Sequence, residues 1–286
     1  MKPAPLSYRR AESVEHAVTL LGEYGDDARV LAGGQSLMPL LNMRRLTPKL
    51  LVDITRVPGL DRVNGPEVGA LVTQFAFGEH SGLDDAIAEC LPYTGHYATR
   101  HRGTIGGSIA FGEPRGELPL VLLTLGGAAS VRCVGGQREI AAEDLYTGAY
   151  TTTVKADELF VSTRWPQARP GEGRAFIELA QRHGDFTLAC ACASVTVERG
   201  EIVAARIGVG AVADRPLLLD GPARALIGSS ADGAGAQDAI AAAADATTRA
   251  IDAYDDHHAS ARYRRHLAGA LVADAARRAL DRARRA

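Results

Sequence analysis

Apolar residues recur at helical spacing in several segments of this chain. In residues 14–24 they form one helical face, with Ser13 placed to cap the first turn and Gly25 to end the helix. The segment 83–91 has a similar face and stops at Pro92, which cannot continue a helix. Further helices are expected in an unbroken apolar run and in two Ala-rich segments near the end of the chain, over residues 118–125, 234–254 and 260–285.

Shorter apolar runs between these segments predict strands. Three of them are separated by short turns and are expected to form an antiparallel sheet from residues 175–179, 188–198 and 202–209. A Gly135-Gly136 turn joins two further strands into a hairpin within residues 128–140. The other strands are expected at residues 29–31, 50–54, 67–73 and 159–164.

The elements divide at a polar segment containing Pro and Gly, residues 167–174. We therefore expect a first domain, residues 1–170, built from subdomains 1–56 and 57–170, and a second domain, residues 171–286, with the three-stranded antiparallel sheet and helices. Helices mixed with mainly antiparallel strands place the chain in the α+β class. A chain of 286 residues, 46% of them hydrophobic, is long enough to bury a core in each domain.

Charge and cysteine content argue against several functions. With 32 basic and 34 acidic residues the net charge is −2, so no overall field attracts nucleic acid or an anionic membrane. The four cysteines, at positions 90, 133, 190 and 192, include no Cys-x-x-Cys pair for a zinc or iron–sulfur site and are interpreted as buried free thiols. The start of the chain has no apolar signal core, and no window reaches the ~20 apolar residues of a membrane span. We expect a cytoplasmic protein.

Two Gly-Gly pairs form the centre of the candidate site. Gly33-Gly34 follows a short apolar run and precedes Gln35 and Ser36, whereas Gly106-Gly107 lies between Thr104 and Ser108. Glycine permits positive φ and leaves no Cβ in the way of a ligand, so successive N–H groups can converge on an anion. Each pair alone is most simply a tight turn, but two such loops in one domain predict a diphosphate held from both sides.

Other motifs give weaker signals. Neither Gly-Gly pair continues as a Walker A loop, and the Gly208-Val-Gly210 run is followed by Asp214-Arg-Pro216 rather than by the helix of a Rossmann fingerprint. Asp255-Asp-His-His258 is interpreted as a solvated break between helices rather than a metal site. The basic residues in 277–285 are interpreted as the exposed face of the last helix, with a protein contact as the alternative. No pattern identifies a catalytic nucleophile, acid or base, which suits a chain whose cofactor performs the chemistry.

Four ordered segments carry a family resemblance that covers nearly the whole chain. They are residues 32–44 (AGGQSLMPLLNMR), residues 102–110 (RGTIGGSIA) with residues 117–119 (ELP), residues 181–186 (QRHGDF) and residues 256–267 (DHHASARYRRHL). Together they resemble the FAD-binding, or medium, subunit of the molybdenum hydroxylases, the family of carbon monoxide dehydrogenase and xanthine dehydrogenase. The resemblance implies a two-subdomain FAD-binding domain of the vanillyl-alcohol-oxidase/PCMH type, followed by a C-terminal flavoprotein domain.

The resemblance also implies where FAD binds. The two glycine loops would hold the pyrophosphate, Glu117 would lie near the ribose, and Leu159 and Phe160 would pack by the ring system. Glu178 stands where many relatives carry a Lys that would stabilise reduced flavin, so either Arg182 or another cation substitutes or the reduction potential is lower. The implied cofactor-binding residues are Ala32, Gly33, Gly34, Gln35, Ser36, Leu37, Thr104, Gly106, Gly107, Ser108, Glu117, Leu159, Phe160 and Glu178.

The function implied by the resemblance is electron transfer through FAD. A small partner subunit with [2Fe–2S] clusters would deliver electrons, a large molybdopterin-binding subunit would oxidise the substrate, and an external acceptor would take the electrons from this chain. The complex would be a heterotrimer that dimerises, and this chain would supply no catalytic or metal-ligating residue. The alternatives are a self-contained FAD-dependent oxidoreductase and a flavin-free scaffold or nucleotide-binding subunit. The substrate, whether carbon monoxide, a purine, an N-heterocycle or a ketone, would bind in another chain and stays open, as does the acceptor.

Overall fold

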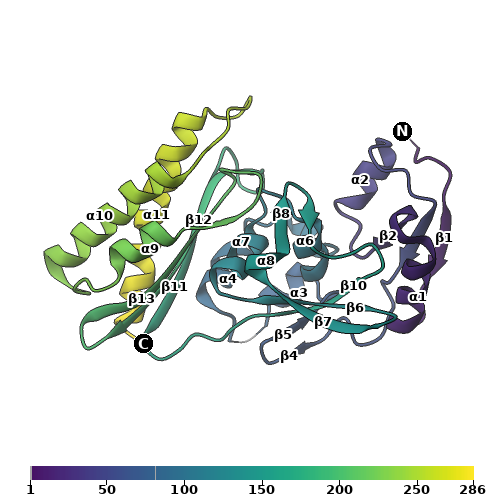
Figure 1. Cartoon of the computed structure of the whole chain (residues 1–286), viewed down its shortest axis with the longest axis horizontal. Helices are drawn as coiled ribbons and strands as arrows, with labels where there is room; N and C mark the ends of the chain where they lie inside the picture. Colours follow the sequence, from purple (N-terminus) through teal and green to yellow (C-terminus); the bar gives the residue numbers. More distant parts are fainter. Residues whose placement is uncertain (1, 81) are drawn as a thin grey trace.

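The computed structural model describes residues 2–80 and 82–286 and contains three principal sheets, which follow one another along the long axis of the molecule (Figure 1). A three-stranded parallel sheet lies at the N-terminal end, a five-stranded antiparallel sheet in the middle, and a four-stranded antiparallel sheet at the C-terminal end. Each sheet is covered by helices over its own cluster of buried apolar side chains. The α+β class expected from the sequence is confirmed.

The N-terminal subdomain is a small parallel sheet with strand order β1-β3-β2. Helix α1 begins as predicted, because the Ser13 hydroxyl accepts a hydrogen bond from the His16 N–H, and it ends at Gly25 with φ of 49°. The exposed strand β1 and the short helix α2 were not predicted, since neither has a clear apolar period. The elements are β1 (Ser7–Arg10), α1 (Val14–Tyr24), the 3-10 turn η1 (Gly25–Asp27), β2 (Ala28–Leu31), α2 (Leu37–Asn42) and β3 (Leu50–Asp53).

The middle subdomain is built on an antiparallel sheet with strand order β4-β5-β10-β6-β7. The predicted hairpin is confirmed as β6 and β7, and the predicted apolar helix is confirmed as α7, every residue of which is buried. The strand expected over 67–73 is shorter, because the chain leaves the sheet after Gly69 and Thr73 caps helix α3. Its first elements are β4 (Val63–Asn64), β5 (Glu67–Gly69), α3 (Gln74–Gly78), α4 (Asp85–Cys90), α5 (Tyr97–Arg100) and α6 (Ile105–Phe111). The others are α7 (Glu117–Thr124), β6 (Ala128–Cys133), β7 (Gly136–Ala141), α8 (Ala142–Leu145), β8 (Tyr146–Gly148), β9 (Thr151–Thr152) and β10 (Leu159–Arg164).

The C-terminal sheet has strand order β11-β12-β13-β14. Its three long strands match the predicted ones, and the two-residue strand β14 adds a fourth at the edge. Helix α10 ends at Ala250 rather than at the predicted residue 254. The elements are β11 (Glu172–Ala180), β12 (Thr187–Glu198), β13 (Glu201–Gly210), β14 (Leu217–Leu218), α9 (Asp220–Leu226), α10 (Gly233–Ala250) and α11 (Ala261–Ala283).

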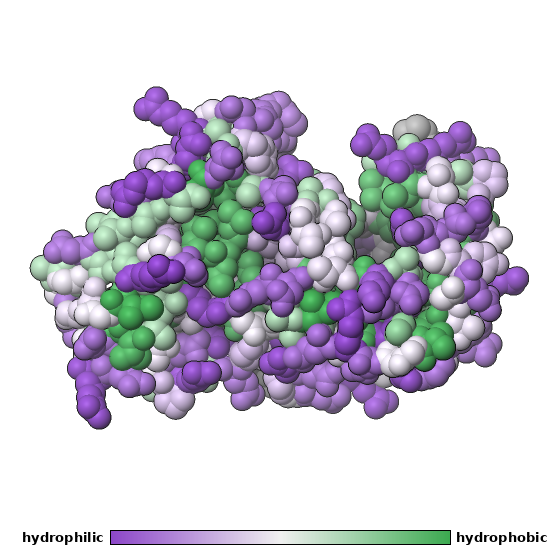
Figure 2. Space-filling model, in the orientation of Figure 1, coloured by the Kyte–Doolittle hydropathy of each residue, from purple (hydrophilic) through white to green (hydrophobic). Residues whose placement is uncertain are grey.

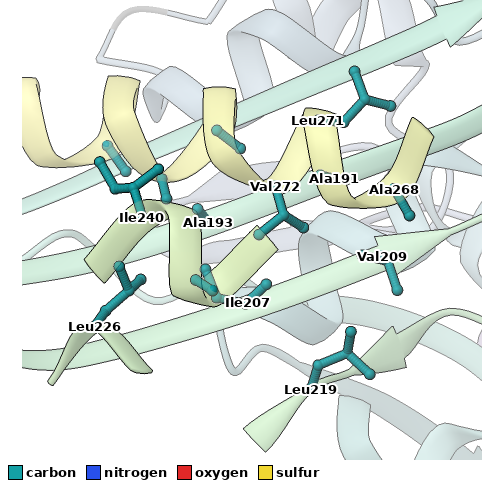
Figure 3. Packing of buried hydrophobic residues seen from close by; sticks show 14 of the residues in the cluster. Ala191, Ala193, Ile207, Val209, Leu219, Leu226, Ile240, Ala268, Leu271 and Val272 are labelled. Carbon is teal, nitrogen blue, oxygen red and sulfur yellow. The ribbon is translucent and has the colours of Figure 1, made fainter. Parts of the chain in front are cut away.

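The two faces of the C-terminal sheet pack against different partners. On one face, Leu271 and Val272 of α11 lie over Ala191, Ala193 and Ile207 in the C-terminal core (Figure 3). On the opposite face, the side chains of Phe176, Cys190 and Cys192 are buried in the same cluster as the residues of α7. The second face therefore joins the C-terminal domain to the middle subdomain.

Part of the basic tail contributes to the same junction. The Arg282 guanidinium lies 2.7 Å from a Glu89 carboxylate oxygen and 3.1 Å from one of Asp85, both in α4. Arg284 lies 3.2 Å from Asp232, at the start of α10. The expectation of an exposed basic face is therefore wrong for these two arginines, which tie α11 to neighbouring elements.

Replacement of Gly173 by Ala should destabilise the C-terminal domain. A Cβ on Gly173 would lie 2.0 Å from the Ala279 carbonyl oxygen, and the backbone of α11 would have to move. We expect a loss of about 2 kcal/mol in the free energy of unfolding, measured by chemical denaturation. Gly221→Ala in α9 is the matched control, because its Cβ meets no atom within 4 Å. Equal stability of the two variants would contradict the close packing of β11 on α11.

Candidate functional site

The first glycine loop connects strand β2 to helix α2. The chain turns at Gly34, whose φ is 73°, as expected for a loop of this kind. Gln35 folds back so that its side-chain amide donates a 3.0 Å hydrogen bond to the Gly33 carbonyl oxygen. Within the described residues, the backbone N–H groups of residues 33–37 and the Ser36 hydroxyl have no hydrogen-bond acceptor. The loop therefore presents a run of unpaired donors that an anion can bind.

The second glycine loop differs from the expected nest. Gly106 and Gly107 lie in the first turn of helix α6 and have no positive φ. Their N–H groups are already used, because Gly106 donates to the Ala70 carbonyl at 3.1 Å and Gly107 to the capping Thr104 hydroxyl at 3.0 Å. The expectation that both loops supply free backbone donors is therefore wrong for the second loop. Its glycines instead permit close approach, since a Cβ on Gly106 would lie 2.6 Å from the Ala70 Cα.

The two loops, distant in sequence, are in direct contact. A Cβ on Gly33 would lie 2.1 Å from the Arg102 carbonyl oxygen and 2.9 Å from the Gly103 Cα. The Cβ position of Gly107 is 3.9 Å from the Ala32 Cβ and 2.8 Å from the Thr104 hydroxyl oxygen that caps the helix. The structure thus brings together the first loop and residues 102–108. The first loop contributes the unpaired donors, and the second contributes the glycines that allow the close contact.

A pocket of about 450 Å³ lies at this junction, lined by the first loop together with Asp53, Thr55 and Arg102. The face drawn in Figure 2 is hollowed between the N-terminal subdomain, at the right, and the middle of the molecule. Burial would raise the pKa of Asp53, but hydrogen bonds from the Thr55 N–H and the Tyr8 hydroxyl lower it overall, so Asp53 is a carboxylate. A larger hollow of about 520 Å³ lies between α10 and α11, at the other end of the molecule from the loops (Figure 1).

Asp53 and Arg102 were not identified from the sequence. Asp53 ends strand β3, beside the end of β2, and the carboxyl ends of neighbouring parallel strands meet at one edge of a sheet, where ligands often bind. The position of Asp53 at the end of a predicted strand could therefore have identified it as a candidate binding residue. Arg102 directly precedes the second glycine motif, but nothing in its sequence context indicates that it faces the first loop. Within the described residues Arg102 has no ion-pair partner, so it is the cation available to the pocket.

Two predicted acidic residues lie farther along the molecule. Glu117 begins helix α7 and Glu178 lies in β11, and each side chain is more than nine-tenths buried, at 8% exposure. Burial raises the pKa of Glu117 to about 7 against hydrogen bonds from its own N–H and from Thr94. Burial and the charge of Glu117 raise the pKa of Glu178 to about 8. Neither Glu178 oxygen has a hydrogen-bond partner among the described residues.

The apolar pair at the start of β10 is buried in two different cores. Leu159 packs in the N-terminal cluster and Phe160 in the middle cluster, because successive strand residues point to opposite faces of the sheet. Their side chains therefore hold the two subdomains together. No group of three residues suited to bind a metal ion is found in the described part of the chain, and none of its helices is long and apolar enough to cross a membrane.

Two contacting glycine loops line one pocket with unpaired backbone donors and an arginine that has no ion-pair partner among the described residues, an arrangement suited to the diphosphate of a dinucleotide cofactor. The chain belongs to the family of FAD-binding domains in molybdopterin dehydrogenases. The model of that family matches residues 4–168, and the model of the CO dehydrogenase flavoprotein C-terminal domain matches residues 174–279.

Relatives and solved structures of similar length support this assignment. The chain is 37% identical to the 6-hydroxypseudooxynicotine dehydrogenase complex subunit alpha of Paenarthrobacter nicotinovorans, over 99% of this chain and 97% of that protein. It is 35% identical to the carbon monoxide dehydrogenase medium chain of Afipia carboxidovorans, over 99% and 100% of the two chains. The crystal structure of quinoline 2-oxidoreductase from Pseudomonas putida 86 superimposes with a TM-score of 0.89 at 33% identity, over 99% of each chain. The protein is an FAD-carrying medium subunit of the molybdenum hydroxylase type, an oxidoreductase subunit of a multi-subunit complex.

The residues present fit FAD. The donors of residues 33–37 and the Arg102 side chain match the charge of a pyrophosphate, and the missing Cβ of Gly33 lets the two loops meet beside them. The unpartnered carboxyl of Glu178 gives a further polar group that a cofactor can satisfy.

Replacement of Arg102 by Gln should weaken FAD binding about tenfold, which corresponds to about 1.4 kcal/mol, because the pocket loses its available cation. The loss should shrink as salt is raised, since screening already weakens the wild-type contact. Arg102→Lys should retain most of the affinity, and Arg262→Gln, on the exposed side of α11, is the control. Fluorescence titration with FAD measures all four chains. An Arg102→Gln affinity equal to wild type at low salt would contradict the role of Arg102.

Proposed function

We propose that this chain holds one FAD between its two glycine loops, receives electrons from a small [2Fe–2S] subunit and passes them to an external acceptor. A large molybdopterin-binding subunit completes the proposed heterotrimer, which dimerises in the cytoplasm. FAD supplies the redox chemistry at its isoalloxazine ring when bound. The observation that carries the proposal is the contact between the loops, which places the unpaired N–H groups of residues 33–37 opposite Arg102.

In this proposal the chain binds and orients the cofactor and performs no proton transfer on a substrate. The first loop, from Ala32 to Leu37, donates backbone hydrogen bonds to the pyrophosphate, and the hydroxyls of Thr104 and Ser108 border it. Gly106 and Gly107 keep the approach clear of side chains. Glu117, expected from the sequence near the ribose, is proposed to lie instead near the ribityl chain, because it approaches Glu178 at the ring end. Glu178 belongs to the ring end of the site. Leu159 and Phe160, whose side chains are buried in the two cores, would border the ring only through their backbone. The proposed domains are residues 1–170 and 171–286.

The substrate of the complex is proposed to be selected outside this chain. Relatives with 33–37% identity over nearly their whole length are named for different substrates: 6-hydroxypseudooxynicotine, carbon monoxide and quinoline. Similar medium subunits thus occur in enzymes whose substrates share little chemistry. The cysteines are free thiols, which is typical of a reducing compartment and supports the proposed cytoplasmic location.

Purification of the tagged chain from its native host tests the proposal. We expect two companion chains, a flavin absorption spectrum, and iron and molybdenum by metal analysis. A chain that carries flavin and turns over a substrate by itself would support a self-contained oxidoreductase instead. A chain without flavin that co-purifies with partners would support a scaffold.

Gly107→Val should give folded chain with little bound FAD. The new side chain enters the space between the second loop and Ala32. Its Cβ would lie 2.8 Å from the Thr104 hydroxyl that caps α6, so this hydroxyl must shift, at a cost of about 1 kcal/mol that should leave the chain folded. Circular dichroism checks folding and the flavin-to-protein absorbance ratio measures retention. The control is Gly221→Ala, because Gly221 is helical and its Cβ position meets no atom within 4 Å. Gly95 is not used as a control, because its φ of 64° disfavours any side chain. Stoichiometric FAD in Gly107→Val would remove the second loop from the diphosphate site.

A further inference from the structure

Glu178 is a buried acid that pairs with none of the described residues. Its side chain is 8% exposed, and both carboxyl oxygens lack a hydrogen-bond partner among the described residues. Buried carboxyl groups are normally hydrogen-bonded or ion-paired, because an unsolvated carboxylate is costly. Glu172, on the same strand, follows that rule: it lies 2.6 Å from the Arg174 guanidinium and accepts a 2.7 Å hydrogen bond from Ser194.

The Glu178 carboxyl lies at the junction of the two domains. Successive strand residues alternate between faces, so Glu178 shares a face with Phe176, two residues earlier. Its partner in register on β12 is Cys190, and Phe176 and Cys190 both pack in the middle cluster with α7. Gly210, the next residue across the sheet, lies under Leu120, one turn after Glu117 in that helix. Glu178 and Glu117 therefore approach from opposite sides of one interface.

The groups around Glu178 are acids and thiols. Glu117 faces it from α7, Cys190 from β12, and Cys90 from α4, and Glu113 adds further negative charge near Glu117. Glu113 is itself paired with Arg115 at 3.4 Å. Of the two interface carboxyls, only Glu117 has donors that stabilise its anion, from Thr94 and its own N–H. Burial, together with the charge of Glu117, favours the neutral form of Glu178 and raises its pKa to about 8.

Of the two alternatives from the sequence, a substituting cation or a lower reduction potential, the first has no support in the charges that act on Glu178. Arg182 lies in the exposed β11–β12 loop and does not contribute to the electrostatics of Glu178. Since Glu178 stands where many relatives carry Lys, another group must stabilise negative charge at this position. A carboxylate only accepts hydrogen bonds, whereas a protonated carboxyl donates one through its O–H.

We propose that Glu178 is a neutral carboxylic acid in the working protein and donates its O–H hydrogen bond to an acceptor atom on the ring system of the bound flavin. The inference rests on the proposed function. Helix α6 begins beside the diphosphate loops, and the chain then continues through residues 112–116 to Glu117; in this inference the ring end of the cofactor lies at this interface. A neutral donor stabilises the negative charge of the reduced ring system less than Lys does, but without the repulsion of a carboxylate. Glu178 thus contacts the cofactor directly, and its protonation state sets the reduction potential.

Spectroelectrochemical titration of the FAD-loaded chain tests this inference between pH 6 and 10. Above the pKa of Glu178 its new negative charge opposes reduction of the flavin. The equilibrium constant for two-electron reduction of wild type should therefore fall at least tenfold relative to Glu178→Gln, which corresponds to a reduction potential lower by about 30 mV. Glu178→Gln keeps a donor and cannot ionise, so its potential should match wild type near pH 6 and lack the fall. The reduction potential of Glu178→Ala should be lower than that of wild type at pH 6. A fall that persists in Glu178→Gln would overturn the proposal.

Unfolding of the flavin-free chain separates this inference from the proposed function. An acid with a pKa raised in the folded state takes up a proton on folding, so its contribution to stability is complete below its unfolded pKa and is lost as pH rises toward about 8. Relative to Glu178→Gln, the wild-type folding equilibrium should fall by up to tenfold per pH unit between pH 6 and 8, followed by the fluorescence of the single tryptophan, Trp165. Glu172→Gln, whose parent carboxylate has a lowered pKa, should keep the wild-type slope.

The reduction titration and the unfolding measurement test different claims, so either can fail without the other. A chain that binds no FAD contradicts the proposed function, and the unfolding comparison still decides whether Glu178 is neutral. Parallel pH profiles for wild type and Glu178→Gln would show that Glu178 is ionised in the folded chain and would refute the inference even in a protein that binds FAD.

Discussion

The contact between Gly33 and the Arg102 carbonyl oxygen is the constraint on which the site depends. The two backbones approach so closely that a Cβ would lie 2.1 Å from that oxygen, and no other residue than glycine fits without moving a loop. This contact fixes the first loop against the second and leaves the N–H groups of residues 33–37 pointing away from the protein's own acceptors. A diphosphate bound there meets donors that need no rearrangement.

Each of the three sheets contributes residues to the proposed cofactor site. The parallel sheet supplies the first loop and Asp53 at its carboxyl edge, whereas the middle subdomain supplies Arg102 and the helix that begins at Gly106. The C-terminal sheet closes the far end, where Glu178 faces the start of α7. Ion pairs of Arg282 with α4 and the packing of Gly173 on α11 hold this sheet in place. In the proposed function, the diphosphate lies between the first two subdomains, and docking of the C-terminal domain brings Glu178 to the start of α7.

Elements with strong periods were predictable from the sequence, and contacts between distant segments were not. Helix α1, with its cap at Ser13, and the long strands β11 to β13 follow from local pattern, and the two Gly-Gly motifs identified the loops and the family. Short helices such as α3 and α5 have too few residues for a period, and β1 is wholly exposed. The hydrogen bond from the Gly106 N–H to the Ala70 carbonyl, and the approach of Glu178 to Glu117 across an interface, depend on packing that local sequence does not encode.

The most direct test of the account compares FAD with riboflavin binding to the flavin-free chain by fluorescence titration. If the contacting loops hold a diphosphate, FAD should bind at one per chain and at least a hundredfold more tightly than riboflavin, equivalent to about 2.7 kcal/mol. ADP should compete with FAD, because it carries the same diphosphate and adenosine. Equal affinities for FAD and riboflavin, with no competition by ADP, would contradict the diphosphate site and the account built on it.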